Sequence, residues 1–245
     1  MPASLESYSL TPIGHIATPF RQKFAIPRQP NLVNAKGMIT FLAPYSDPTC
    51  FKDIDAFSHL WLLFLFHETM ERGWKPAVKA PRLGGNATLG VFASRSTHRP
   101  NGIGMSVVRN GGLVKDGKTL MLEVEGVDLL DGTPIIDIKP YLPYADGIPD
   151  ATDALPNPIA PGQVPVIFAP DCEAELARRN KKHADFRSLL TGVLAQDPRP
   201  AYRHKLKTDE RDYHVALYDA DILWRMVDGC IHVIAIRDGE PGRAG

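Results

Sequence analysis

Cysteine and long apolar runs are both scarce in this 245-residue sequence. The three cysteines, Cys50, Cys172 and Cys230, are odd in number and far apart, which argues against a disulfide framework and a cysteine-based zinc site. The longest unbroken apolar run, Leu60–Phe66, is too short to cross a bilayer. The first ten residues have neither a basic start nor an apolar stretch. We therefore expect no signal peptide, no membrane segment and a reducing, cytoplasmic location.

The sequence also lacks the common catalytic signatures. It has no Gly-x-x-x-x-Gly-Lys-Ser/Thr, Gly-x-Ser-x-Gly or His-Glu-x-x-His motif. His67-Glu68 has no cysteine partners of the kind that a zinc deaminase needs, and we expect no metal site. Gly102-Ile103-Gly104 neither follows a strand-like run nor includes a third glycine. The commonest methyltransferase architecture, the Rossmann fold, is therefore not supported.

Net charge is absent as well, because 28 Lys and Arg balance 28 Asp and Glu. The distribution is uneven, however. No acidic residue occurs from Arg72 to Lys115, and two further basic clusters lie at 178–182 and 199–207. These clusters predict local positive faces that suit anionic ligands. Solvated surface charge is the alternative, and the helical 178–182 run favours neither interpretation.

Proline and glycine, with 22 and 20 residues, are plentiful and predict many turns between short strands. In the first 150 residues, strand-like runs separated by turns predict a closed or rolled antiparallel sheet. These runs are residues 37–42, 60–66, 89–93, 119–125 and 134–138. Asp116-Gly117 is a hairpin-turn dipeptide before the 119–125 run, which alternates cleanly between apolar and polar residues.

The rest of the chain has a different pattern. Prolines between 146 and 164 forbid a helix or a central strand there and predict a linker or a long ordered arm. The apolar spacing of Phe186, Leu189, Leu190, Val193 and Leu194 predicts an amphipathic helix, with Asp185 as its N-cap. Strands are expected at 213–218, 222–227 and 231–236. We interpret this part as a small α+β domain.

Two kinds of polar segment are denser than core packing requires. Pro27-Arg28-Gln29-Pro30 is a strap stiffened by proline, and a surface turn is the alternative. The loops Arg82–Asn86 and Arg95–Gly104 are rich in arginine and glycine. Arginine forks match carboxylate and phosphate groups, and glycine lets backbone N–H groups approach a ligand. The loops predict an anion-binding surface, with a solvated basic face as the alternative.

Two further segments combine charge with aromatic residues. In Asp128–Tyr141, Asp137 alternates with isoleucines and shares a strand face with Lys139, so the two can pair. Such a pair is structural or tunes an acid–base group. Asp197–Arg203 holds two arginines and a tyrosine on a loop stiffened by proline, which suits phosphate contact and base stacking. A helix stop with solvated arginines is the alternative.

These segments resemble the TsaA-like family, whose best-known members are TrmO-type tRNA methyltransferases acting on N6-threonylcarbamoyladenosine. The matches occur in family order along nearly the whole chain. They are residues 23–30, 56–61, 82–86, 128–141 and 197–203. The resemblance implies a mainly β chain with added α+β structure. It also implies a single-sheeted antiparallel β-barrel in an S-adenosylmethionine-binding domain at 1–150, a small α+β domain for tRNA recognition at 151–245, and a homodimer.

By motif, the resemblance assigns the cofactor contacts to one set of residues. They are Pro27, Arg28, Gln29, His67, Glu68, Arg95, Met105, Asp128, Leu129, Leu130 and Asp131. The family often has proline at the position of Gly102, so we expect a looser loop beside Arg95 and Met105.

The implied reaction transfers a methyl group to N6 of the modified adenosine at position 37 of threonine tRNAs. Because this urea-like nitrogen is a poor nucleophile, a base that removes its proton would help. Our hypothesis gives that role to Asp137, with Lys139 and Tyr141 orienting the substrate. A single-stranded anticodon loop is recognised by stacking and phosphate contacts. The expected RNA contacts are Arg99, Arg199, Tyr202 and Arg203.

Two other functions stay open from the residues alone. One is an RNA- or nucleotide-binding module without catalysis. The other is a small-molecule methyltransferase on the same barrel, since a fold does not determine a substrate.

Overall fold

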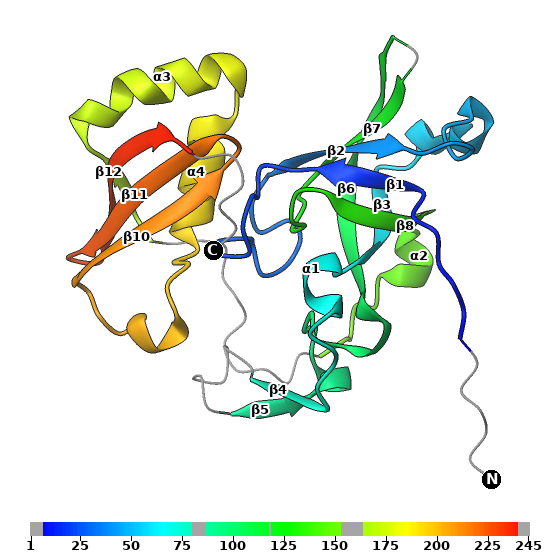
Figure 1. The fold of residues 1–245 in the computed structure, drawn as a ribbon, viewed down its shortest axis with the longest axis horizontal. Helices are drawn as coiled ribbons and strands as arrows, with labels where there is room; N and C mark the ends of the chain where they lie inside the picture. Colours follow the sequence, from blue (N-terminus) through cyan, green and yellow to red (C-terminus); the bar gives the residue numbers. More distant parts are fainter. Residues whose placement is uncertain (1–6, 80–86, 118, 153–163, 240–245) are drawn as a thin grey trace.

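Six strands of the N-terminal half pair into a closed antiparallel barrel (Figure 1). The computed structural model describes residues 7–79, 87–117, 119–152 and 164–239. Around the barrel, the order is β1 (Gly14–Ala17), β2 (Lys36–Phe41), β7 (Thr119–Glu125), β6 (Ile103–Asp116), β3 (His59–Leu65) and β8 (Thr133–Pro140). β8 pairs with β1 through Gly14 and Ile135 and so closes the ring.

Strict alternation along the strands separates the barrel interior from its outer surface. On β3, Leu60, Leu62 and Phe64 are buried, whereas the residues between them are partly exposed. Leu122 and Val124 of β7 are fully buried, as the alternation of 119–125 predicts. Gly117 adopts φ +57 between β6 and β7, which are paired as a hairpin.

Shorter elements lie beside the barrel. They are the single-turn helices α1 (His67–Met70) and α2 (Pro143–Asp146) and the two-stranded sheet of β4 (Ala77–Lys79) and β5 (Thr88–Gly90). The strand predicted at 89–93 is wrong beyond Gly90, because Val91–Ala93 forms a 3-10 turn. Ser94 closes this turn by donating from Oγ to the carbonyl of Val91 at 2.9 Å.

The C-terminal half is a four-stranded sheet with two helices (Figure 1). Its order is β10 (Asp209–Leu217), β11 (Ala220–Val227), β12 (Cys230–Asp238) and β9 (Val166–Phe168), with β9 parallel to β12. The helices are α3 (Glu173–Lys182) and α4 (Phe186–Ala195). α4 buries the five predicted apolar residues, and Asp185 occupies its N-cap position without a side-chain capping bond.

The segment between β1 and β2 contacts both halves. Phe20 forms a β-bridge with Leu217 of β10. The backbone N–H of Tyr218 donates to Pro19 at 2.8 Å, and Arg21 Nε donates to the carbonyl of Tyr218 at 3.1 Å. The C-terminal sheet thus packs against the chain that leads into the Pro27–Pro30 strap. Most of the predicted linker, 153–163, lies outside the described residues, and the expected domain boundary at 150 stays a prediction.

The prediction of a mainly β chain with added helices is confirmed. β1, β4, β6 and β9 were not expected from the sequence.

Candidate functional site

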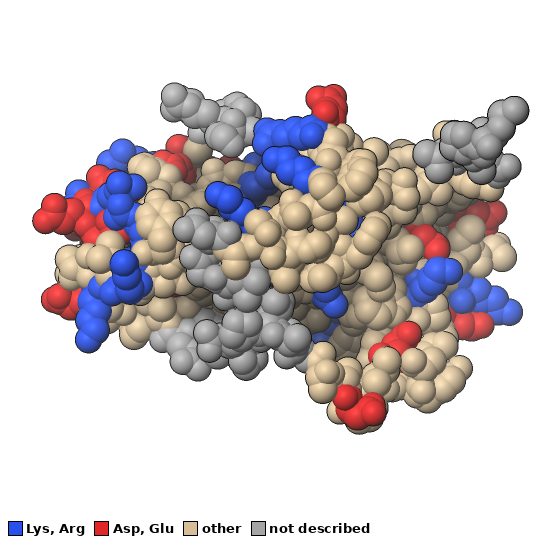
Figure 2. Space-filling view, turned by 90° about the horizontal axis from the view of Figure 1, so that it is seen from below, with Lys and Arg blue, Asp and Glu red and all other residues tan. Residues whose placement is uncertain are grey.

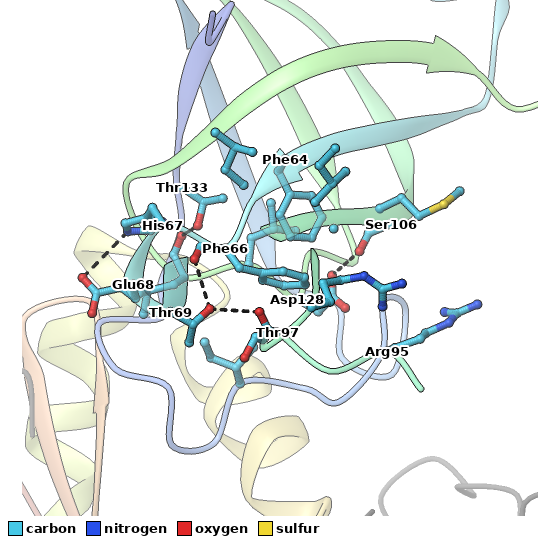
Figure 3. Close-up of a pocket in the computed structure, with 18 of the residues that line it drawn as sticks. Phe64, Phe66, His67, Glu68, Thr69, Arg95, Thr97, Ser106, Asp128 and Thr133 are labelled. Atoms are coloured by element: carbon cyan, nitrogen blue, oxygen red, sulfur yellow. Dashed lines mark hydrogen bonds and ion pairs between the residues drawn. The ribbon is translucent and has the colours of Figure 1, made fainter. Parts of the chain in front are cut away.

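A pocket of about 800 Å³ opens at one end of the barrel (Figure 3). Its wall is built from five segments that are far apart in the sequence. They are the strap at 23–29, the end of β3 with the start of α1, the loop at 94–101, the start of β6, and the loop after β7. The volume is within the usual range for small-molecule and cofactor sites.

Most of the expected cofactor contacts line this pocket. Those that do are Pro27, Arg28, Gln29, His67, Glu68, Arg95, Met105, Asp128, Leu129 and Leu130. Asp131 is not part of the lining. Its carboxylate accepts a hydrogen bond from the Thr18 N–H at 2.9 Å and pairs with Arg21. It therefore holds the base of the 128–131 loop. Arg99, expected at the RNA, also lines the pocket.

Asp128 is the most strongly perturbed group of the pocket. Burial raises the pKa of its carboxyl to about 6, because desolvation disfavours the charged form. Two groups oppose this effect. Ser106 Oγ donates to Asp128 Oδ1 at 2.7 Å, and the positive charge of Arg95 favours ionisation. A largely buried carboxylate beside an apolar wall is suited to a cationic or hydroxyl-bearing ligand.

The pocket arginines have no carboxylate partner of their own within the described ranges. Arg95 donates to the side-chain carbonyl of Gln29, and Arg99 Nη1 donates to the carbonyl of Ser94 at 3.0 Å. Their charges remain available to an anionic ligand group. The loop carrying them is bonded on both sides of Gly102, whose N–H donates to Arg99 and whose carbonyl accepts from Phe66 at 2.7 Å.

Several lining residues were not expected from the sequence. Phe64 and Phe66 supply aromatic wall, with ring centroids 5.3 Å apart. Thr69 Oγ1 lies 3.1 Å from the carbonyls of Phe66 and Thr97, which ties α1 to the 94–101 loop (Figure 3). Ser106 could have been recognised from the sequence, because it is a hydroxyl-bearing residue among apolar neighbours in a buried strand. A buried hydroxyl needs a hydrogen-bond partner.

Asp137, Lys139 and Tyr141 do not line the pocket. Asp137 pairs across the sheet with Leu63, which pairs in turn with Met105, so the three share one row of the outer barrel face. Lys139 Nζ lies 3.3 Å from Asp137 Oδ2, as the strand alternation predicts. Tyr141 lies beside Trp61, with ring centroids 5.9 Å apart. Asp137 thus lies two strands away from Met105, in the row of the pocket-lining Leu63, whereas the Tyr141 N–H donates to His59 at the other end of β3.

The residues of the 197–203 segment face in different directions. Tyr202 is exposed. Arg203 is largely buried and donates to both carboxylate oxygens of Asp209 at 2.8 Å. Arg199, expected at the RNA, is instead buried with its side chain 2% exposed, and it pairs with Asp197. Its guanidinium does not face solvent in this structure.

The basic cluster at 178–182 is surrounded by acidic side chains. In the 178–182 run, Arg178, Arg179 and Lys182 pair with carboxylates of Glu175, Asp219 and Asp238. That run is therefore largely neutralised locally. On the face in Figure 2, Lys and Arg side chains gather near the middle of the molecule, whereas both signs of charge mix at its left end. Arg82–Asn86, a predicted anion-binding loop, lies outside the described residues.

Neither a cluster of metal-ligating side chains nor a membrane-spanning helix occurs among the described residues. Within 7–79, 87–117, 119–152 and 164–239, no three His, Cys, Asp or Glu side chains gather as a metal site. No helix in these ranges has the length and apolar character needed to span a membrane.

Several proteins similar to this chain are named as methyltransferases. The family described as the tRNA-methyltransferase O N-terminal domain matches residues 15–147, and the TrmO C-terminal domain matches 161–239. The Escherichia coli K12 tRNA (adenine(37)-N6)-methyltransferase is 44% identical over 95% of this chain and 99% of its own length. A Pseudomonas aeruginosa relative, provisionally named as an S-adenosylmethionine-dependent methyltransferase, is 44% identical over 89% of this chain and 92% of its own. A crystal structure of TrmO from P. aeruginosa superposes with a TM-score of 0.77 at 38% identity, covering 97% of this chain and all of that one.

The chain belongs to the TrmO family of tRNA methyltransferases. The resemblance drawn from the sequence motifs is thereby confirmed.

Proposed function

We propose that this chain is an S-adenosylmethionine-dependent methyltransferase that modifies N6 of N6-threonylcarbamoyladenosine at position 37 of threonine tRNA. The main supporting observation is that ten of the eleven residues assigned to the cofactor by family motif line one pocket. They come from five segments of the chain, so this convergence needs the whole barrel. The relatives' names, which specify adenine 37 of tRNA, support the acceptor.

The pocket residues fit the chemistry of S-adenosylmethionine, which supplies an electrophilic methyl group when bound. Arg28 and Arg95 suit its carboxylate. Asp128 suits its ammonium or ribose hydroxyls, and Gln29 suits the edge of its adenine. Phe64 and Phe66 exclude water from the same space, which strengthens the polar contacts.

The adenine that receives the methyl group lies on the outer barrel face beside the pocket. Adjacent strands are about 4.8 Å apart, so Asp137 is roughly 10 Å from the strand of Met105. A nucleobase over Leu63 spans that gap. The Asp137 carboxylate then accepts the N6 proton, Lys139 orients the carboxylate, and Tyr141 stacks on the substrate.

Binding of the anticodon loop extends this site toward Arg99 at the pocket and toward Tyr202 and Arg203 of the C-terminal half. We place the cofactor domain at 1–150, the tRNA-recognition domain at 151–245, and the protein in the cytoplasm with its tRNA. Met105 lines the pocket yet is 54% exposed, and a second copy of the chain would cover it. This supports a homodimer with the pocket at the cleft between subunits.

The test is methyl transfer from labelled S-adenosylmethionine to tRNA with or without threonylcarbamoyl at adenosine 37, followed by nucleoside mass analysis. We expect label only on the modified nucleoside. Label on neither tRNA, with the cofactor bound, contradicts the proposal. It then favours a non-catalytic RNA-binding module or a small-molecule methyltransferase.

The role of Asp137 needs its own variant. Asp137→Asn should lower turnover with cofactor affinity unchanged. The matched control is Asp116→Asn, which removes a carboxylate from the exposed β6–β7 turn and should have no effect. Full turnover by Asp137→Asn eliminates Asp137 as the proton acceptor.

A further inference from the structure

The loop between α4 and β10, residues 196–208, is held from inside by one buried arginine. Arg199 donates from Nε to Asp197 Oδ1 and from Nη2 to Asp197 Oδ2, both at 2.7 Å. Its Nη1 donates to the carbonyl of Leu206 at 3.1 Å and lies 3.9 Å from Asp209 Oδ2. Its own carbonyl lies 2.8 Å from His204 Nε2. A single residue thus connects the beginning, the middle and the end of the loop through its side chain and its carbonyl.

A second pair completes this network. Arg203 Nη1 donates to both oxygens of Asp209 at 2.8 Å, and Tyr213 Oη donates to Asp209 Oδ2 at 2.9 Å. Asp209 is buried, and these donors hold the pKa of its carboxyl at about 2. Both arginine charges are therefore matched by carboxylates within the fold, which is the condition under which buried charges are tolerated.

Tyr202 points the other way. It sits in the 3-10 turn Ala201–Arg203 with 63% of its surface exposed. The Arg203 guanidinium lies 5.7 Å from the centre of the Tyr202 ring. The exposed Lys205 and Lys207 follow on the same loop. A tyrosine ring with an arginine beside it and two exposed lysines on the same loop is a surface on which an unstacked RNA base can lie, with phosphates near the lysines.

We infer that Arg199 is a positioning residue for RNA recognition: it does not touch the RNA, and it holds the 196–208 loop so that Tyr202 is presented as a base-stacking surface. The inference rests on the proposed function for the identity of the RNA, but its test measures binding and not catalysis. A rigid loop loses little freedom on binding, so the network increases affinity through preorganisation.

The experiment measures the affinity of the full-length protein for tRNA over a series of salt concentrations. Tyr202→Leu should weaken binding about 10-fold, because one base loses its stacking partner. Arg199→Lys keeps the charge but loses the planar fork, and it should weaken binding to a similar extent. The double variant should be no weaker than either single variant, because both changes remove the same contact.

The salt dependence separates positioning from direct contact. A lost phosphate contact reduces the slope of log affinity against log salt by about 0.7 to 0.9. Arg199→Lys and Tyr202→Leu should leave this slope unchanged, whereas Lys205→Gln should reduce it. Arg178→Lys is the control for an arginine-to-lysine change on the exposed surface of α3, and it should alter neither affinity nor slope.

Several results overturn the inference: a reduced slope with Arg199→Lys, unchanged affinity with Arg199→Lys, independent effects in the double variant, or no binding of tRNA by the wild type. If Arg199→Lys fails to fold, Asp197→Asn provides the same test, because it removes the bidentate partner. Tryptic cleavage at Lys205 and Lys207 should accelerate in Arg199→Lys and not in Tyr202→Leu. If the wild-type protein binds tRNA but transfers no methyl group, the proposed function is contradicted and the inference about Arg199 is not.

Discussion

The arginines of the barrel pocket and those of the C-terminal half have opposite surroundings. Arg95 and Arg99 bond to neutral oxygens and keep their charge for a ligand. Arg179, Arg199 and Arg203 are enclosed by carboxylates of the same half. The same residue type is therefore left without a carboxylate partner in one region and is part of the architecture in the other. What decides between them is the local supply of Asp and Glu, which is absent from Arg72 to Lys115.

The largest effect should come from Arg179→Met. The Arg179 side chain is 3% exposed and pairs with Glu175, Asp219 and Asp238 at 2.7 Å, so its loss leaves these three carboxylates without their shared buried partner. We expect the free energy of unfolding in urea to fall by about 3 kcal/mol. Arg178→Met removes an exposed arginine that shares two of these partners, and it should cost less than about 1 kcal/mol. Equal losses of unfolding free energy in the two variants would contradict the architectural role of the buried arginine.

Arg95→Met should weaken cofactor binding and leave stability almost unchanged, which is the reverse of the effect expected for Arg179→Met. A hydrogen bond to a charged group contributes about 1.5–3 kcal/mol, so S-adenosylmethionine should bind roughly 10- to 100-fold more weakly by calorimetry. The free energy of unfolding should change by less than about 0.5 kcal/mol, because Arg95 has no carboxylate partner. Arg109→Met, on the exposed side of β6, is the control. If the loss in unfolding free energy exceeded the loss in binding free energy, Arg95 would be a structural residue like Arg179, and the difference between the two regions would not hold.

Asp128 should make stability and binding respond to pH in opposite directions. Its native pKa of about 6 exceeds the ordinary value of 3.8, so between these values the native state holds more protons than the unfolded state. Stability of the ligand-free protein should therefore fall by about 1–3 kcal/mol as pH rises from 4 to 8. Cofactor binding through the carboxylate should instead weaken as pH falls through 6.

Asp128→Asn provides the check, with urea unfolding and calorimetry at pH 5 and pH 8. It should be more stable than the wild type at pH 8 and bind the cofactor more weakly. Parallel pH profiles of unfolding for the two proteins would show that Asp128 is not the group responsible.

The smallest effect concerns the loop that carries Arg99. Gly102 has φ +59, and a Cβ there would lie 2.9 Å from Met70 Cγ. Gly102→Ala should cost about 1–2 kcal/mol in unfolding experiments, from the left-handed backbone and this contact. Gly73→Ala has a similar φ of +68 with nothing within 4 Å, so it isolates the backbone contribution. An equal cost at both positions would mean that Met70 moves aside freely.

Periodicity predicted the parts of the fold that bury one face in a regular way. The 119–125 strand and the helix from Phe186 follow their alternation and 3.6-residue spacing because each packs one side against the core. β6 was not predicted, since glycines at 104, 111 and 112 interrupt its pattern. Each lies at a close approach or a bulge that only the folded sheet creates, such as Gly104 against the ring of Phe64.

The site was predictable to the extent that its residues carry motifs. The strap and the 128–131 loop are recognisable in sequence, but the convergence of five segments on one cavity is a property of barrel closure. The orientation of Arg199 was not predictable, because the local sequence, an arginine between two prolines, is compatible with a side chain that faces water and with one that faces a buried aspartate. In the folded chain, Asp197 has a left-handed backbone, φ +48, and its carboxylate is paired with Arg199.

Closure of the barrel has a consequence for synthesis of the chain. Thr18 and Asp131, which bond between the end of β1 and the 128–131 loop, are 113 positions apart. At 5 to 20 residues per second, a ribosome needs roughly 6 to 23 s to produce that stretch. For this interval β1 and β2 have exposed edges and no partner to close the ring. The nascent N-terminal strands must be kept from aggregating until β8 emerges, and no cofactor can protect them earlier, because the pocket does not yet exist.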